Sequence, residues 1–231
     1  MVGIEVWGDF ACFTRPETKV ERLTYPVITP SAARGIFEAI YWKPQFRWVI
    51  EKIEILSPIR YISLRRNEVK DKVPSERIIG QWMTGRREIT PLWADGTPDM
   101  LGTDEKGRTQ RQTIALKSPH YRIFASVEPW PEYIKFSSKF QAQFLRRAAH
   151  GQCVYQPYLG LREFPAYFSL ASAHHLPAPI DITEDWGHMV YDVFPRTSPG
   201  TPYSSPEVRV FSCQVKSGVV IVPHYSQLVI E

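Results

Sequence analysis

A phenol, an indole and an ammonium stand side by side in the stretch E-A-I-Y-W-K-P, residues 38–44. Tyr41 can hold or orient a proton, Trp42 can stack on a flat ring, and Lys43 can neutralise an anion. Apolar residues recur at helical spacing up to this point and Pro44 then ends the helix. The group is either a core stripe that finishes with a solubilising lysine or a small reactive surface, and for Trp42 a core position is the favoured interpretation.

Two helices and a series of strands would have to position these residues. The first predicted helix begins at Ser31 as its N-cap, and the second covers residues 137–152 and ends at Gly151. Phe140, Phe144, Leu145 and Ala148 form the predicted buried stripe of the second helix. Strands are predicted over residues 4–13, 46–56, 60–69, 113–117, 121–127, 189–194, 208–215 and 218–223, with 113–117 and 121–127 as a pair and the last two as a hairpin. Residues 157–170 are predicted as a glycine-marked turn that leads into a further strand.

The order strand, helix, two strands, helix, strand predicts an α+β, ferredoxin-like fold with additions. Residues 70–110 are rich in charge, glycine and proline and show no period, which predicts an inserted hairpin or a mobile loop. We predict a first domain over residues 1–170 and a small antiparallel β region over residues 171–231.

Composition excludes several classes. The 231 residues are 43% hydrophobic, which is typical of a globular protein. Three scattered cysteines without a C-x-x-C pair predict neither a zinc site nor a disulfide framework, and His120, His150 and the pair His174-His175 lack the context of metal ligands. We therefore expect no metal and no cofactor. The first residues predict neither a signal peptide nor a membrane anchor, so a cytoplasmic protein is expected.

Positive charge gathers in the first two thirds of the chain, and residues 134–162 hold five Lys or Arg and no acid. This pattern favours a polyanionic partner or, equally, a solvated basic face. Several residues are candidate contacts for such a polyanion. Lys43, Arg65 and Arg66 suit phosphates, Arg146 and Arg147 suit a duplex backbone or belong to a solvated face, and Gly160 with Arg162 forms either a phosphate-binding turn or a simple turn.

Four stretches resemble the CRISPR-associated Cas-five family, in the subtype of type I-C systems that is also called the c or d variant. They are W-G-D-F-A-C-F-T-R-P-E-T-K-V-E, P-S-A-A-R-G-I-F-E-A-I-Y-W-K-P, R-R-N-E-V and Y-L-G-L-R-E-F-P-A, and together they span roughly residues 5–170 in order. The resemblance implies a RAMP-type ferredoxin-like domain with an inserted β-hairpin and a second small β region.

The same resemblance implies a function. Members bind the repeat hairpin of precursor CRISPR RNA, cut it without metal, keep the mature guide RNA and cap its 5′-handle in the Cascade complex, beside the backbone and large subunits. The family's catalytic tyrosine and lysine fall on Tyr41 and Lys139, whereas Phe140 takes the place of its histidine. A non-catalytic guide-RNA-binding subunit is the alternative function, and a generic RNA-binding β-rich domain is a third.

Metal-free cleavage attacks a phosphate with the neighbouring 2′-hydroxyl and needs a base, a cation on the phosphorane and an acid for the leaving 5′-oxygen. Tyr41 would act as base or orienter if a cation lowers its pKa, and Lys139 would be the cation. The two helices share one sheet face, which makes contact between these residues possible without requiring it. Phe140 cannot move a proton, so cleavage is expected to be slow unless a substitute such as His150 or His120 fills the role.

Overall fold

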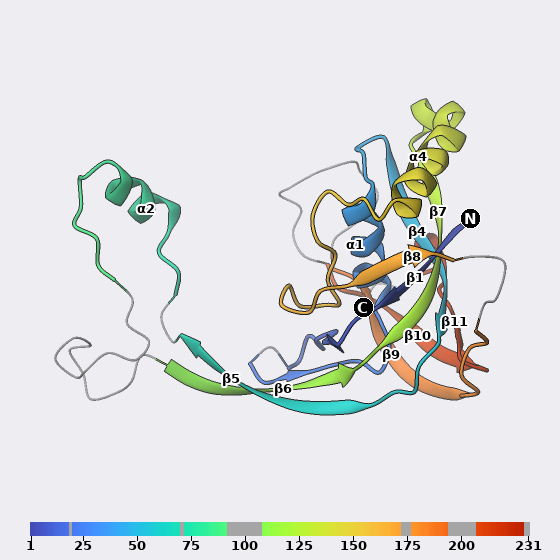
Figure 1. The fold of residues 1–231 in the computed structure, drawn as a ribbon, viewed down its shortest axis with the longest axis horizontal. Helices are drawn as coiled ribbons and strands as arrows, with labels where there is room; N and C mark the ends of the chain where they lie inside the picture. Colours follow the sequence, from blue (N-terminus) through green and yellow to red (C-terminus); the bar gives the residue numbers. More distant parts are fainter. Residues whose placement is uncertain (19, 70–71, 92–107, 172–176, 194–206, 229–231) are drawn as a thin grey trace. The chain divides into compact units, whose positions relative to one another are not determined.

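Figure 1 shows the fold in a computed structural model, which describes the chain apart from residues 19, 70–71, 92–107, 172–176, 194–206 and 229–231. The described chain forms two compact units, Met1–Ile62 with Ile114–Glu231 and Ser63–Thr113. The predicted boundary at residue 170 stays a prediction. The pair His174-His175 and much of the predicted insert lie outside the described residues.

A seven-stranded antiparallel sheet forms the centre of the first unit, with the order β8-β1-β7-β4-β11-β10-β9. Alternate side chains of its strands are buried on one face, because successive residues of a strand point to opposite sides. The strands are β1 (Val2–Trp7), β4 (Phe46–Ile55), β7 (His120–Pro129), β8 (Tyr167–Leu170), β9 (Glu184–Asp192), β10 (Arg209–Lys216) and β11 (Val219–Ile221).

The chain passes through β1, α1 (Pro30–Ile40), β4, β7, α4 (Ser137–Ala149) and β8, in that order. In space the four strands lie as fourth, first, third and second, which is the ferredoxin-like arrangement. The predicted fold class is therefore confirmed. The hairpin predicted near Ser217 is also present as β10 and β11, and β11 joins the strands of the C-terminal region to β4 of the core.

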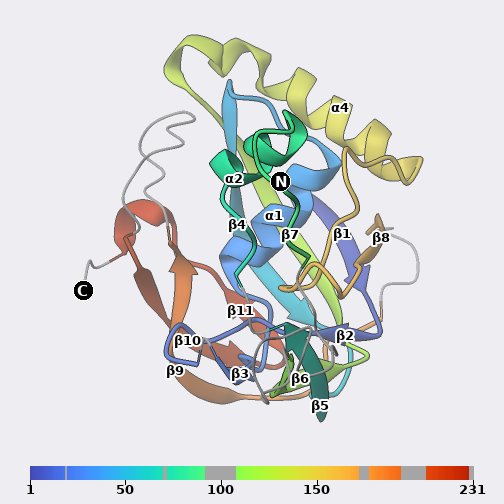
Figure 2. The ribbon, with the colours of Figure 1, turned by 90° about the vertical axis from the view of Figure 1, so that its left-hand side faces the viewer.

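Helices α1 and α4 pack against the same sheet and against each other (Figure 2). Their contact is aromatic, since Phe37 of α1 stacks on Phe144 of α4 with ring centroids 5.1 Å apart and Trp48 of β4 lies 4.7 Å from Phe144. Phe144 and Ala148 are buried as predicted, but Leu145 is 39% exposed, so its predicted place in the buried stripe is wrong.

Three local predictions fail for identifiable reasons. Thr29 rather than Ser31 caps α1, because its side chain accepts a hydrogen bond from the Ala32 amide. The strand predicted over residues 4–13 breaks at Gly8 into β1 and β2 (Phe10–Ala11), where a Cβ would lie 2.7 Å from the Pro165 carbonyl oxygen. Strands 113–117 and 121–127 do not pair, because the turn at Ser118, with φ of 49°, sends them into different sheets.

A second, four-stranded sheet contains β2, β6 (Arg108–Lys117) and β3 (Arg22–Leu23), and β5 (Tyr61–Val69) pairs with β6. Between β5 and β6 the chain forms the helix α2 (Glu76–Met83), in a segment for which we predicted no regular period. That prediction is wrong for these eight residues. Ile78, Ile79 and Trp82 follow helical spacing, but the run is short and Gly80 interrupts it.

No helix of the described chain is long and apolar enough to span a membrane.

Candidate active site

A hollow of about 520 Å³ lies where α1 ends and α4 begins. Its lining combines two phenols, two ammonium groups, two amides and two phenyl rings. They belong to Tyr41, Lys43, Gln45, Tyr133, Phe136, Lys139, Phe140 and Gln143. The two residues predicted to be catalytic, Tyr41 and Lys139, thus line the same surface depression. This depression is called the hollow from here on.

Strand pairing places the two helix ends together. β4 starts at Phe46, soon after α1 ends, and β7 ends at Pro129, just before the 3₁₀ helix η1 (Pro131–Phe136) that leads into α4. Phe46 and Pro129 are direct partners in the antiparallel register of β4 and β7. The end of α1 and the start of α4 therefore meet at one edge of the sheet. The meeting is a consequence of the sheet topology and not an accident of the loops.

Trp130 fastens the two segments to each other. Its backbone N–H donates to the Gln45 carbonyl oxygen at 3.0 Å, and its indole Nε1–H donates to the Pro44 carbonyl oxygen at 2.8 Å. The Tyr133 amide in turn donates to the Trp130 carbonyl at 2.8 Å. These hydrogen bonds hold the segment that contains Lys43 next to the turn that contains Tyr133.

Tyr41 is the C-cap of α1 and is only 8% exposed. Its carbonyl oxygen accepts a hydrogen bond from Trp48 Nε1 at 2.8 Å, and its ring packs 5.7 Å from Phe46. Burial raises the pKa of the Tyr41 phenol, and the positive charge of Arg147 opposes that rise only in part. The lowered pKa required for a base is therefore not found, and Tyr41 suits a neutral, orienting phenol.

The two lysines of the hollow provide its positive charge. Lys43 and Lys139 are both exposed, and the Lys139 ammonium lies 5.3 Å from the centre of the Phe136 ring. An ammonium beside an aromatic face is held by the ring quadrupole while its protons stay free for an anion. The hollow can therefore receive a phosphate from two sides.

Phe140 stands where the resemblance places a histidine, and it belongs to the core. It is 8% exposed and its ring lies 4.9 Å from that of Phe46. Neither predicted substitute is in the hollow. His150 is at the other end of α4, roughly 16 Å along the helix axis from Lys139, and pairs with the Arg146 carbonyl. His120 faces away from the helices and contacts Glu5 at 3.2 Å.

Of the other predicted contacts, Arg146, Arg147, Gly160 and Arg162 lie in the first unit. Trp42 is 46% exposed beside the hollow, so its predicted core position is wrong. Arg146 is exposed, whereas Arg147 donates its Nε–H to the Ile40 carbonyl at 2.7 Å and thereby caps α1. Arg162 is exposed at the turn after Leu159.

Gly160 has φ of 84°, and a Cβ there would lie 2.0 Å from the Cys12 carbonyl oxygen. Close backbone packing therefore accounts for the glycine. It lines a separate groove of about 570 Å³ that also contains Thr14 and Gly35.

Arg65 and Arg66 belong to the unit Ser63–Thr113 and differ from each other. Arg65 is exposed on β5, whereas Arg66 is half-buried and its Nη2 lies 3.1 Å from Thr113 Oγ1 and 3.4 Å from Glu68 Oε1. Arg65 is thus the better placed of the two for a phosphate.

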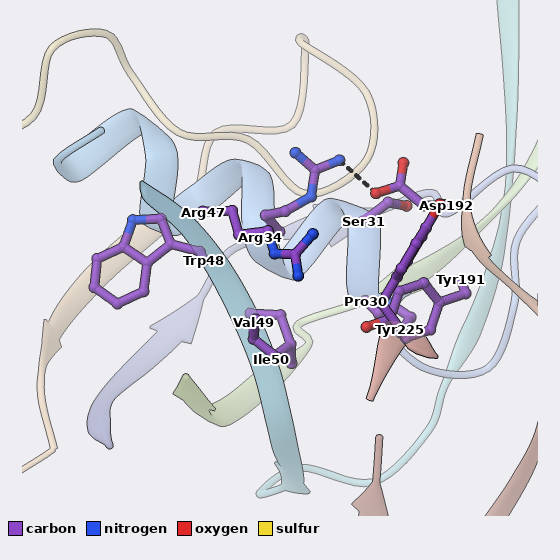
Figure 3. Close-up of a pocket in the computed structure, with 10 residues that line it drawn as sticks. All are labelled: Pro30, Ser31, Arg34, Arg47, Trp48, Val49, Ile50, Tyr191, Asp192 and Tyr225. Carbon is purple, nitrogen blue, oxygen red and sulfur yellow. Dashed lines mark hydrogen bonds and ion pairs between the residues drawn. The ribbon is translucent and has the colours of Figure 1, made fainter. Parts of the chain in front are cut away.

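A small cavity beside α1 lies next to an ion pair that joins two elements of the fold. Figure 3 shows Arg34 of α1 reaching Asp192 of β9, at 2.9 Å, with Arg47 and Tyr225 nearby. Arg34 also pairs with Glu38 at 2.8 Å. The cavity is about 20 Å³, which holds roughly one water. Arg34 therefore links α1 to β9, one of the C-terminal strands.

Sequence reasoning missed four residues that line the hollow, namely Gln45, Tyr133, Phe136 and Gln143. Tyr133 lies in a six-residue 3₁₀ helix with no apolar period of its own. Only the register of β4 and β7 brings it to the hollow that Tyr41 also lines. The signal that could have found it is the run W-P-E-Y immediately before the second helix, because Pro131 at N1 starts a helical turn there.

The fold and the hollow define a class: a ferredoxin-like α+β protein with RAMP-type additions and a phenol- and lysine-lined site at the helix ends. The family described as "CRISPR-associated protein (Cas_Cas5)", in its Cas5d variant, matches residues 1–223. The chain belongs to this family, which confirms the resemblance drawn from its motifs.

Two curated relatives cover most of the chain. One from Mannheimia succiniciproducens, "CRISPR pre-crRNA endoribonuclease Cas5d", is 39% identical over 97% of this chain and 95% of its own. One of the same name from Thermus thermophilus is 37% identical over 86% of this chain and 76% of its own.

Solved structures support the fold. The "Crystal Structure of CRISPR-associated Protein" has a TM-score of 0.64 at 18% identity and covers 99% of this chain and 94% of that one. A functionally uncharacterized protein, SMU1763c from Streptococcus mutans, has the same TM-score and identity and covers 99% of this chain and 95% of its own.

Proposed function

We propose that the chain is a metal-independent endoribonuclease that cuts precursor CRISPR RNA at its repeat. Family membership and the names of the two curated relatives support the substrate and the reaction class. The single observation that carries the proposal is that Tyr41 and Lys139, the residues matched to the family's catalytic pair, line one hollow together with Lys43.

The reaction is transesterification. The 2′-oxygen attacks its own phosphate, the bond from phosphorus to the 5′-oxygen breaks, and a 2′,3′-cyclic phosphate and a 5′-hydroxyl are left. Lys43 and Lys139 stabilise the charge that accumulates on the phosphorane oxygens. The buried Tyr41 phenol orients the 2′-hydroxyl by a hydrogen bond, because a phenol with a raised pKa stays neutral. The proton of the nucleophile passes to solvent.

The exposed arginines outside the hollow are placed to bind phosphates of the RNA away from the cleavage site. Arg146 and Arg162 lie in the first unit and Arg65 in the second, and each can bind phosphate without selecting a base. After cleavage the guide RNA stays bound, and the protein caps its 5′-handle within Cascade beside the backbone and large subunits. The setting is the cytoplasm, where precursor RNA is made.

Phe140 supports a second function, a guide-RNA-binding and assembly subunit that does not cut. A phenyl ring packed against Phe46 cannot move a proton. One gel assay separates the two functions: purified protein is incubated with its own repeat RNA in EDTA. A discrete cut with a cyclic phosphate end supports the nuclease, and a stable complex with intact RNA supports the binding subunit.

A further inference from the structure

The hollow must contain a group that can protonate the leaving 5′-oxygen if cleavage takes place there. The leaving 5′-oxygen needs a proton as its bond to phosphorus breaks, and the family's histidine is absent at Phe140. None of the residues that line the hollow is a histidine. Its groups with exchangeable protons are two phenols, two ammonium groups and two amides. Amides do not transfer protons at neutral pH, so the phenols and the lysines remain.

The lysines are poor candidates for the acid. Each serves the phosphorane by its positive charge, and a lysine that gave up its proton would lose that charge when the transition state needs it most. A phenol is neutral before it donates. It can therefore supply a proton without removing positive charge from the phosphate.

The two phenols have different surroundings. Tyr41 is 8% exposed, and its backbone is held by Trp48 and, one residue earlier, by Arg147. Tyr133 is half-buried at the rim, on the turn that Trp130 fastens to Gln45. An acid must regain a proton from water in every cycle, and the partly exposed phenol can do so. The deep phenol can hold the nucleophile on the other side of the phosphate.

Resting on the proposed function, we propose that Tyr133 is the general acid of this enzyme and stands in for the missing histidine. As the 2′-oxygen bonds to phosphorus, the electron pair of the breaking bond moves to the 5′-oxygen, which takes the phenolic proton of Tyr133. The proton of the 2′-hydroxyl goes to hydroxide, and water reprotonates the Tyr133 phenolate. Phe136 and Phe140, whose rings lie 6.5 Å apart, form the apolar wall beside this step.

A change of leaving group tests the role directly. Repeat RNA with sulfur in place of the bridging 5′-oxygen at the cut releases a thiolate, which leaves without a proton. With the oxygen substrate, Tyr133→Phe should slow single-turnover cleavage about 10²- to 10⁴-fold. With the sulfur substrate it should cut at nearly the wild-type rate. Tyr41→Phe should be slow on both substrates, because its role is at the nucleophile. Tyr167→Phe, an exposed tyrosine on β8, is the matched control and should leave both rates unchanged.

The possible outcomes distinguish the role of Tyr133 as general acid from the proposed endoribonuclease activity itself. If wild type cuts and Tyr133→Phe is equally slow on both substrates, or is unchanged on the oxygen substrate, Tyr133 is not the acid and the endonuclease stands. If wild type cuts neither substrate, the proposed function fails and the inference falls with it. Tyr133→His provides a second readout, because an imidazole can also donate a proton. This variant should cut the oxygen substrate at least about tenfold faster than Tyr133→Phe. No gain over Tyr133→Phe would count against the role.

Discussion

Arg147 of α4 donates its Nε–H to the carbonyl oxygen of Ile40 at 2.7 Å, and so holds the end of α1 one residue before Tyr41. The same guanidinium is the cation that moderates the rise in the Tyr41 pKa. The predicted RNA contact at Arg147 is thus also a structural link between the two helices. Its neighbour Arg146 is exposed.

The two arginines should therefore respond differently to alanine. Arg147→Ala should lower the free energy of unfolding by about 1.5–3 kcal/mol, as for a lost hydrogen bond from a charged group, and should raise the Tyr41 pKa further. Urea unfolding and an NMR titration of the tyrosines measure both. Arg146→Ala should change neither and should weaken RNA binding slightly in low salt. Equal loss of stability in the two variants would contradict the link.

Lys139 and Lys135 form a matched pair, because their ammonium groups lie 5.3 and 5.2 Å from the centre of the Phe136 ring. Of the two, Lys139 lines the hollow. Lys139→Ala should abolish cleavage, by a factor of about 10² or more, while the RNA stays bound. Lys135→Ala should cut normally. Single-turnover rates and filter binding give both quantities, and a loss of cleavage in both variants would place the phosphate elsewhere.

Phe140→His should accelerate cleavage, because it returns an imidazole to the wall of the hollow. It should also lower stability by about 2 kcal/mol, since Phe140 is buried against Phe46. Phe144→His is the control: that ring is fully buried and does not line the hollow, so it should lose stability without gaining rate. If Phe140→His leaves the rate unchanged while the protein stays folded, an imidazole at this position has no access to the RNA.

Replacement of Arg65 and Arg66 by alanine should weaken binding of repeat RNA and flatten its dependence on salt by up to about one unit of slope per lost contact. Arg65→Ala alone should account for most of the effect, because Arg66 already contacts Glu68 and Thr113. Affinities measured from 50 to 300 mM salt, roughly the range over which phosphate contacts weaken, decide the matter. A slope that does not change would remove β5 from the RNA interface.

The pH dependence of cleavage follows from the burial of Tyr41. Burial raises its pKa from an ordinary value of about 10, so Tyr41 stays protonated between pH 6 and 9 and causes no plateau there. The rate should increase with pH over this range, as hydroxide takes up the proton of the nucleophile. A bell-shaped profile centred near pH 6.5, roughly the pKa of a histidine, would point to an imidazole in the reaction.

Sequence periodicity was sufficient for the long elements. The stripe through Phe140 and Phe144 predicted α4, and the glycine turn after Lys216 predicted the last hairpin. It failed for α2, a short helix that contains Gly80 and has no buried side chain among the described residues. An apolar period arises when one face of a helix is buried, and α2 has no buried residue that would produce one.

The site was predictable only in part. Motif resemblance predicted Tyr41 and Lys139, but nothing local to the sequence links Tyr133 to Tyr41. The two residues line the same hollow because Phe46 pairs with Pro129. The direction of the Tyr41 pKa shift depends on how deeply the helix end is buried, which the spacing of residues does not give. Tertiary register and desolvation are therefore the two quantities that sequence reasoning lacked.

The pairing of Phe46 with Pro129 has a consequence for the newly made protein. Tyr41 and Lys43 leave the ribosome early, whereas Tyr133 of η1 and Lys139 of α4 follow only after β7. A nascent chain that lacks these segments has no hollow. Under the proposed function, a ribosome-bound fragment of this kind should therefore not cut. Domains fold as units during synthesis, and here the completion of that unit acts as the switch. A translation product truncated before β7 would therefore contain Tyr41 and Lys43 but would lack Tyr133 and Lys139 of the hollow.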